Sequence, residues 1–174
     1  MCGFVGFTGQ LSQGETVLKN MMDAIIHRGP DSAGMHVDEN VSLGFRRLSI
    51  IDLDSGTQPM YNETGDIVIV FNGEIYNHGE LREELIKEGH VFSNNADTEV
   101  IIHGYEQYGE GKLQKLRGMF AFVIWDSKKK KLFAARDFFG IKPFYYAMVD
   151  GQLVFASEIK SNLEYTPYKK EMNK

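Results

Sequence analysis

The chain has 174 residues, the length of one ordinary domain, and its 43% hydrophobic and 25% charged residues are typical of a globular protein. A formal net charge of −5 argues against nucleic-acid binding as the main role, because neutralising phosphates requires a basic excess. One cysteine excludes an internal disulfide, and neither a transmembrane run nor a signal peptide is evident, so we expect a cytoplasmic protein with no membrane partner.

The single cysteine, Cys2, directly follows Met1. Removal of Met1 would leave Cys2 with a thiol and a free α-amine, whose reference pKa values are about 8.5 and about 7.7–8.0. The amine can then serve as the base for the thiol without a His or Asp partner. Cys2 is therefore a candidate nucleophile, although a lone cysteine near a chain start is more often a small buried apolar residue.

The first third of the chain predicts short strands and one amphipathic helix. A strand is expected over residues 3–8, and apolar residues recur at helical spacing from Val17 to Ile26. The run 27–31 places two cations in the last helical turn and then Gly-Pro, which by itself indicates a helix stop. Strands are expected over 33–37 and 41–45.

Two arginines, Arg46 and Arg47, open the next strand-like segment, which extends to Asp52. Neighbouring arginines are usually solvated, and by itself this pair carries no function. Residues 56–59 are expected to form a connecting loop.

The clearest strand covers residues 67–71, whose five consecutive apolar residues imply burial on both faces. It continues into Asn72-Gly73, a pair that ordinarily marks a tight turn. Asn77 with Glu80 resembles a capping box and predicts a helix over 78–88.

A further helix is expected from Asp97 to Tyr108, with an acidic first turn that the helix dipole stabilises. Strands are then predicted over 118–125, 132–135, 144–149 and 152–156, with a solvated lysine turn between the first two. Residues 165–174 read as a linker or tail.

Many strands with a few helices between them, and no regular β–α alternation, predict an α+β fold of two mainly antiparallel sheets flanked by helices. The sequence contains no nucleotide-phosphate motif and no Cys/His cluster with metal-ligand spacing. We therefore expect neither a metal nor a cofactor in this domain.

Taken together, the polar loops resemble the glutaminase domain of class II glutamine amidotransferases, and most of all that of glutamine-hydrolysing asparagine synthetase of the asparagine synthetase B type. The resemblance covers about residues 2–163, with further matches at 140–146 and 156–160. The motifs, in family order, are Met1-Cys2-Gly3, His27-Arg28-Gly29-Pro30-Asp31, Arg47-Leu48-Ser49-Ile50, Asn72-Gly73-Glu74-Ile75-Tyr76-Asn77, Asp97-Thr98-Glu99, Gly118-Met119-Phe120-Ala121 and Arg136-Asp137.

The resemblance implies an N-terminal-nucleophile hydrolase fold, a four-layer αββα sandwich, over residues 1–163, with 164–174 as linker or tail. It also implies that Cys2 attacks the side-chain carboxamide of L-glutamine, releases ammonia and forms a γ-glutamyl thioester, which water hydrolyses to glutamate. The Asn72 side chain and the Gly73 backbone N–H would hold the oxyanion.

The resemblance further implies how the substrate is bound. Arg47 would bind the α-carboxylate of glutamine, and Glu74 and Asp97 would accept from its α-ammonium group. The backbone of Leu48, Ile50 and Ile51 would line the site. Asn77 would either support the oxyanion loop or cap its helix, and we expect the cap.

Asparagine synthetases continue into an ATP-dependent synthetase domain, and its Ser-Gly-Gly-x-Asp-Ser-type loop is absent from this sequence. ATP and Mg²⁺ are therefore expected only for that missing domain, which would be the partner of this one in a parent chain. A homodimer is also open. Two alternatives remain: a glutaminase domain that serves amino-sugar or phosphoribosylamine synthesis, and a non-catalytic glutamine-binding regulatory module.

Overall fold

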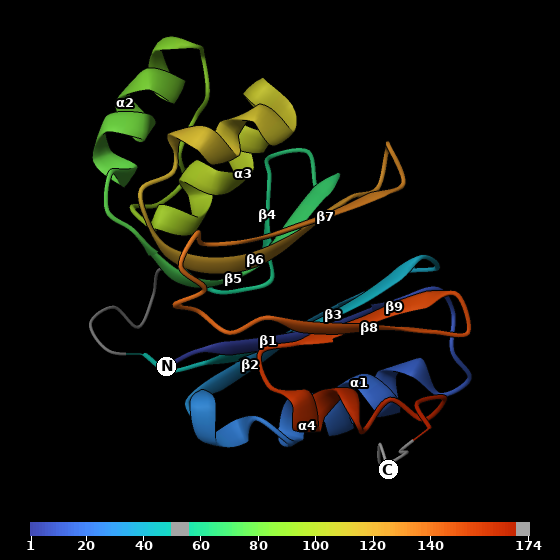
Figure 1. Ribbon diagram of the computed structural model, residues 1–174. Coiled ribbons are helices and arrows are strands. Elements are labelled where there is room, and N and C mark those ends of the chain that lie inside the picture. The colour runs from blue at the N-terminus through green and yellow to red at the C-terminus, as the bar shows by residue number, and fades with distance from the viewer. Residues whose placement is uncertain (50–55, 170–174) are drawn as a thin grey trace. The chain divides into compact units, whose positions relative to one another are not determined.

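The computed structural model describes residues 1–49 and 56–169, apart from the side chains of residues 112 and 113. The predicted site residues Ile50 and Ile51 lie outside the described residues. The chain forms two compact units, a first unit of Met1–Ser49 with Pro143–Lys174 and a second unit of Ile50–Lys142. Each unit is an antiparallel sheet with its own helices (Figure 1).

The first unit contains a five-stranded sheet in the order β2-β3-β1-β9-β8, and all neighbours are antiparallel. Helices α1 and α4 lie on the same face of this sheet (Figure 1). The elements are β1 (Gly3–Thr8), α1 (Gly14–Asp23), the 3₁₀ helix η1 (Ile26–Arg28), β2 (Ser32–Val37), β3 (Val41–Arg47), β8 (Tyr145–Val149), β9 (Gln152–Ala156) and α4 (Ile159–Asn162).

The core of the first unit explains why these segments fold as they do. The predicted apolar stripe of α1, including Leu18 and Met21, packs on residues of β1 and β9. Tyr165 belongs to the same core and is only 3% exposed, so packing continues beyond the predicted boundary at residue 163. The two-residue hairpin predicted between β8 and β9 is confirmed, because Val149 pairs with Gln152.

Helix α1 ends earlier than the sequence pattern predicted. It stops at Asp23, and the chain tightens into η1, where the Arg28 N–H bonds to the Ile25 carbonyl at 2.9 Å. Ile25 stays fully buried, but Ile26, the last residue of the predicted stripe, is 49% exposed. The apolar pattern did not distinguish an α-helical turn from a 3₁₀ turn, in which successive side chains point in different directions.

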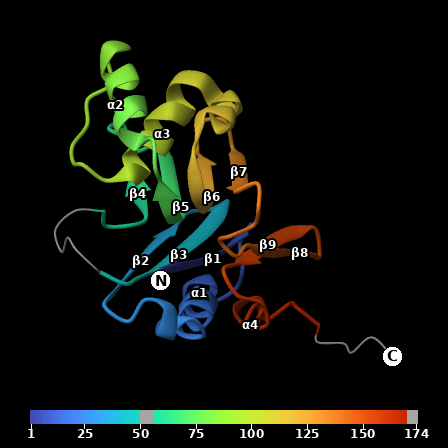
Figure 2. The ribbon, with the colours of Figure 1, turned by 60° about the vertical axis from the view of Figure 1, so that its left-hand side comes forward.

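The second unit contains a four-stranded antiparallel sheet in the order β4-β5-β6-β7. Helices α2 and α3 lie on one face of it (Figure 2), and their apolar residues form one core with β5 and β6. The elements are β4 (Met60–Tyr61), β5 (Ile67–Ile75), α2 (His78–Lys87), α3 (Asp97–Tyr108), the 3₁₀ helix η2 (Gly109–Lys115), β6 (Gly118–Asp126) and β7 (Lys131–Arg136).

Two local interpretations of the second unit change. The strand predicted over 67–71 continues through Asn72-Gly73 to Ile75, because β5 keeps its pairing with β6 along its whole length. The expected helix cap by the Asn77 side chain was wrong, since that side chain makes no capping bond. Its amide instead donates to the Lys115 carbonyl and accepts from the Arg117 N–H, both at 2.9 Å.

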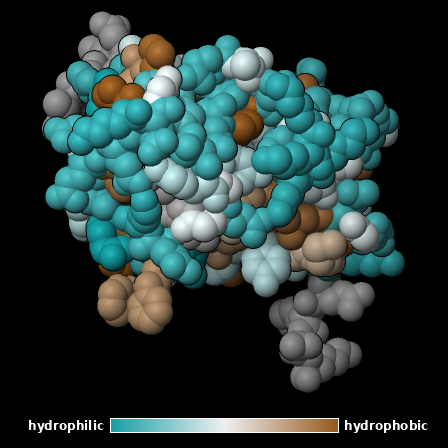
Figure 3. Space-filling model, turned by 90° about the horizontal axis from the view of Figure 1, so that it is seen from above, coloured by the Kyte–Doolittle hydropathy of each residue, from teal (hydrophilic) through white to brown (hydrophobic). Residues whose placement is uncertain are grey.

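The predicted α+β class, with two antiparallel sheets flanked by helices, is confirmed. No helix among the described residues is long and apolar enough to cross a membrane. The face seen in Figure 3 is mostly hydrophilic, with hydrophobic residues scattered among polar ones.

Candidate active site

The predicted site residues divide between the two units. The first unit carries the predicted nucleophile with Arg47 and Leu48. The second unit carries Asn72, Gly73, Glu74 and Asp97, and each set is described within its own unit.

Cys2 directly precedes β1, and its thiol lies against the main chain that leaves β3. The Leu48 N–H donates to Cys2 Sγ at 3.4 Å, and Sγ is 3.7 Å from the Leu48 carbonyl oxygen. Both groups of Leu48 therefore hold the thiol beside the main chain at the end of β3. Cys2 is partly buried and Met1 is 54% exposed, so the end of the chain is accessible.

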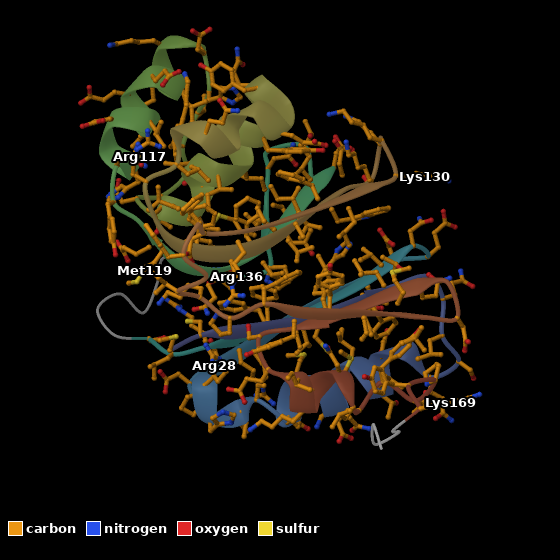
Figure 4. All side chains as sticks on the ribbon, viewed as in Figure 1. Arg28, Arg117, Met119, Lys130, Arg136 and Lys169 are labelled. Atoms are coloured by element: carbon orange, nitrogen blue, oxygen red, sulfur yellow. The ribbon has the colours of Figure 1, made fainter. Side chains whose placement is uncertain are left out.

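Arg28 contacts the predicted nucleophile, although the sequence analysis assigned it no role in the site. Its Nε donates to the Cys2 carbonyl oxygen at 3.0 Å, and its Nη1 bonds to Glu158 Oε1 at 3.1 Å (Figure 4 labels Arg28). A Cβ on Gly3 would lie 3.0 Å from Arg28 Cδ and Nε, so a glycine there lets the arginine lie close to the strand. By itself the Gly-Pro pair in the run 27–31 indicates only a helix stop. The sign that this run has a further role is its place among the motifs of the resemblance.

Asp31, from the same run, fixes the segment that holds the thiol. Its backbone N–H donates to the Arg47 carbonyl at 3.1 Å, and its carboxylate accepts from the Ser49 N–H at 2.7 Å. Two parts of this run therefore position Cys2: Arg28, the last residue of η1, contacts it directly, and Asp31, in the loop that follows, holds the main chain around Leu48.

The two neighbouring arginines have different surroundings. Arg46 is not solvated as expected: its Nη2 forms an ion pair with Asp23, and its Nε donates to the Met22 carbonyl at 3.2 Å. A hydrogen bond from Lys19, together with the charge of Arg46, holds the pKa of Asp23 below its ordinary value against the opposing effect of burial. Arg46 thus ties α1 to β3, whereas Arg47, the predicted carboxylate-binding residue, is partly buried at the end of β3.

Asn72 and Gly73 lie in β5, opposite Ala121 and Phe120 of β6. Asn72 is 3% exposed, and its Nδ2 is buried with no hydrogen-bond partner among the described residues. The backbone N–H groups of Phe71 and Ile75 both point away from β6, to Gln58 Oε1 and Asp97 Oδ2. Because strand N–H groups alternate in direction, the Gly73 N–H points to that same side.

Gly73 is also the residue that this position requires. A Cβ there would lie 2.4 Å from the Met119 carbonyl oxygen and 2.8 Å from Phe120 Cα, which are backbone atoms that cannot yield easily. The second unit therefore presents two neighbouring donors, one from a side chain and one from the backbone, as an oxyanion requires.

Glu74 and Asp97 provide two carboxylates near those donors. Asp97 begins α3 and accepts the Ile75 N–H at 2.8 Å, while Glu74 is exposed. Burial raises the pKa of Asp97, the Ile75 hydrogen bond partly offsets this, and the negative charge of Glu74 raises it further. A cation such as an α-ammonium group would stabilise the ionised form of Asp97 beside the charge of Glu74.

One group of potential metal ligands lies elsewhere in the second unit. Glu63, His90 and His103 offer donor atoms within 4.8 Å of one another. Carboxylates already surround the buried His103, whose Nδ1 is 3.0 Å from Glu106 Oε2. This group does not include any predicted site residue, and the expectation that the domain uses no metal stays a prediction.

A family model described as a glutamine amidotransferase domain matches residues 1–174. The chain is 51% identical over 166 residues to asparagine synthetase [glutamine-hydrolyzing] 1 of Bacillus subtilis strain 168, covering 92% of this chain and 26% of that protein. It is 43% identical over 165 residues to asparagine synthetase [glutamine-hydrolyzing] 2 of Arabidopsis thaliana, covering 92% and 28%.

Among solved structures, glutamine phosphoribosylpyrophosphate amidotransferase from B. subtilis matches with a TM-score of 0.76 at 21% identity, over 92% of this chain and 42% of that one. At this identity the likeness shows the fold, and it confirms the fold that the resemblance implied. The chain belongs to the glutamine amidotransferase domain family. Within that family it is similar to the N-terminal part of glutamine-hydrolysing asparagine synthetases, and it spans about a quarter of the length of the curated relatives that it matches.

Proposed function

We propose that this chain hydrolyses L-glutamine to glutamate and ammonia, with Cys2 as the nucleophile after Met1 has been removed. The thiolate attacks the side-chain carbonyl carbon, and the α-amine of Cys2 takes the thiol proton. The tetrahedral intermediate collapses to a thioester as that proton passes to the departing ammonia. Water then attacks the thioester and gives a proton to the α-amine. As the C–S bond breaks, that proton passes to sulfur, and glutamate leaves.

The observation that carries this proposal is the buried Nδ2 of Asn72, which has no hydrogen-bond partner among residues 1–49 and 56–169. Buried donors in folded proteins nearly always have partners, so an orphan donor is a candidate for a group that binds a ligand. Its neighbour on β5, the Gly73 N–H, points away from the sheet partner and supplies the second donor. Both would bond to the carbonyl oxygen of glutamine as it gains negative charge.

In the proposed complex, the two charged groups of glutamine determine how it is bound. Arg47 would bind the α-carboxylate, with the main chain of Leu48 beside it. Glu74 and Asp97 would bind the α-ammonium group, and its positive charge would remove the mutual repulsion of the two carboxylates.

We propose further that the ammonia serves an ATP-dependent synthetase domain of the asparagine synthetase type. The names of the most similar relatives support this acceptor over amino-sugar or phosphoribosylamine synthesis. ATP and Mg²⁺ would act in that partner domain, whereas glutamine hydrolysis would use no metal or cofactor. A cytoplasmic location and a homodimer belong to the same proposal.

The test is glutamate release from glutamine by the purified chain, with its N-terminal mass determined. We expect turnover when Cys2 is the first residue, and none for Cys2→Ala or for protein that retains Met1, because an amide cannot act as the base. A glutamine analogue with a chloroketone in place of the carboxamide should label Cys2. Equal turnover by wild type and Cys2→Ala would refute the nucleophile, and glutamine binding without turnover by the Met-free chain would favour a regulatory module.

A further inference from the structure

Glu158 is the second residue after β9 and occupies the N-cap position of α4. Its Oε1 is 3.1 Å from Arg28 Nη1 and 2.9 Å from His27 Nε2, and its Oε2 is 3.2 Å from Lys160 Nζ. Burial by itself would raise the pKa of Glu158, but the hydrogen bonds from His27, Arg28 and Lys160 outweigh it and hold the pKa below its ordinary value. The carboxylate is therefore ionised at neutral pH and acts as the counter-charge of Arg28.

Arg28 requires that counter-charge in order to stay where it is. Its side chain is only 12% exposed, and its Nη2 is buried without a hydrogen-bond partner among the described residues. The other two nitrogens bond to the Cys2 carbonyl and to Glu158. Glu158 is the one counter-ion of Arg28 among the described residues. A buried cation that loses its counter-ion is strongly destabilised in that position, so removal of Glu158 would release Arg28.

We propose that Glu158 is a positioning residue for Cys2 and acts through Arg28; this deepens the function proposed above and rests on it. Arg28 fixes the carbonyl oxygen of the same residue whose amine and thiol would react. A displacement of about 1 Å at a reacting group can lower a rate about a hundredfold. Because Glu158 acts on the nucleophile and not on the bound amino acid, its loss lowers kcat more than it raises KM.

The position tolerates substitution. Glu158 borders an open pocket of about 370 Å³, and its side chain is 26% exposed. A shorter side chain there leaves no closed cavity, so the variants are expected to fold. Glu158→Ala removes both the charge and the acceptor, Glu158→Gln keeps an acceptor oxygen, and Lys160→Met leaves the contact between Glu158 and Arg28 intact.

The experiment uses these three variants of the full chain, each with Cys2 confirmed as the first residue. Two quantities are measured: kcat and KM for glutamine, and the rate of Cys2 alkylation by iodoacetamide as a function of pH. The second readout has a single target, because the chain contains one cysteine.

Glu158→Ala should lower kcat by roughly ten- to a hundredfold, with KM within about threefold of wild type. Glu158→Gln should restore most of kcat, because its amide oxygen can accept from Arg28. In Glu158→Gln, the pH at which Cys2 alkylation is half-maximal should move to a lower value, because a guanidinium without its counter-charge favours the thiolate. Lys160→Met should match wild type in both readouts.

Wild-type kcat in folded Glu158→Ala overturns the proposal, and so does a loss in Lys160→Met as large as that in Glu158→Ala. If Glu158→Ala does not fold, Glu158→Gln decides, and an alkylation profile identical to wild type overturns the proposal. A wild type without glutaminase activity refutes the proposed function alone. In that case alkylation still tests whether Glu158 acts on Cys2 through Arg28. A pH profile of alkylation that is unchanged in both Glu158 variants overturns the proposal.

Discussion

Replacing Asn72 with leucine, a side chain of similar volume without polar atoms, should make the protein more stable and far less active. An unsatisfied buried donor costs about 1–3 kcal/mol, and Asn72 Nδ2 is such a donor in the free protein. A gain of about 1 kcal/mol would raise the melting temperature by roughly 2–4 °C in a chain of this size. Loss of one oxyanion donor should lower kcat by about 10²–10³, equivalent to about 2.7–4 kcal/mol.

Asn62 is a matched control in the same unit, because it is a buried asparagine whose polar atoms are satisfied. Its Nδ2 donates to Thr64 Oγ1 at 2.9 Å and to Glu106 Oε1 at 2.7 Å, and its Oδ1 accepts from the Ile67 N–H at 3.0 Å. Asn62→Leu would leave those groups without partners and should cost about 1–3 kcal/mol. It should leave kcat unchanged.

The assay combines thermal unfolding without glutamine and steady-state glutamate release for wild type and both variants. The reasoning predicts opposite stability changes for two chemically identical substitutions. Equal destabilisation of both variants would mean that Asn72 has a partner in the free protein, and retention of kcat within a few-fold by Asn72→Leu would remove it from the oxyanion site.

Three further outcomes follow from the same site. In the proposed complex the α-ammonium group binds the ionised form of Asp97, whose pKa is raised by burial. The KM for glutamine should therefore rise as the pH falls through that raised pKa. Asp97→Asn should raise KM at neutral pH and abolish the pH dependence, which steady-state kinetics across the pH range would show. Gly73→Ala should lower both melting temperature and kcat, because its Cβ would lie 2.4 Å from a carbonyl oxygen of β6; a melting temperature equal to wild type would contradict this. A chelator should leave glutamate release unchanged, and activity that one metal restored would contradict the metal-free chemistry.

The sequence was sufficient for the elements whose burial pattern is local. The stripe of α1 and the apolar run of β5 have patterns that hydrophobic residues reveal directly, and both elements are present, although α1 ends earlier than predicted and β5 continues further. The side-chain roles of Arg46 and Asn77 were predicted wrongly because their partners, Asp23 and the segment before β6, are distant in sequence. Local propensity favours the solvated or capping role and carries no information about such partners.

Less of the site than of the fold could be predicted from the individual residues. Chemistry alone singled out Cys2, whereas Asn72-Gly73 is a turn signal until pairing with β6 is seen to continue to Ile75. Arg28 was hidden for a similar reason: Gly-Pro after it explains a helix end completely, and its contact with Cys2 joins residues 26 positions apart. The resemblance supplied the roles that the residues by themselves did not.

The two units prepare the proposed reaction in opposite ways, and the difference follows from what each must do. A nucleophile has to occupy one position before the substrate arrives, and the main chain of Leu48 and the side chain of Arg28 bond to Cys2 at both its thiol and its carbonyl. An oxyanion site has to remain unsatisfied until charge develops, and Asn72 Nδ2 has no partner among the described residues, although β5 pairs with β6 along its whole length. Preorganised donors of this kind cost stability in the free protein and return it only in the transition state. The stabilising substitution at Asn72 should therefore be the inactivating one.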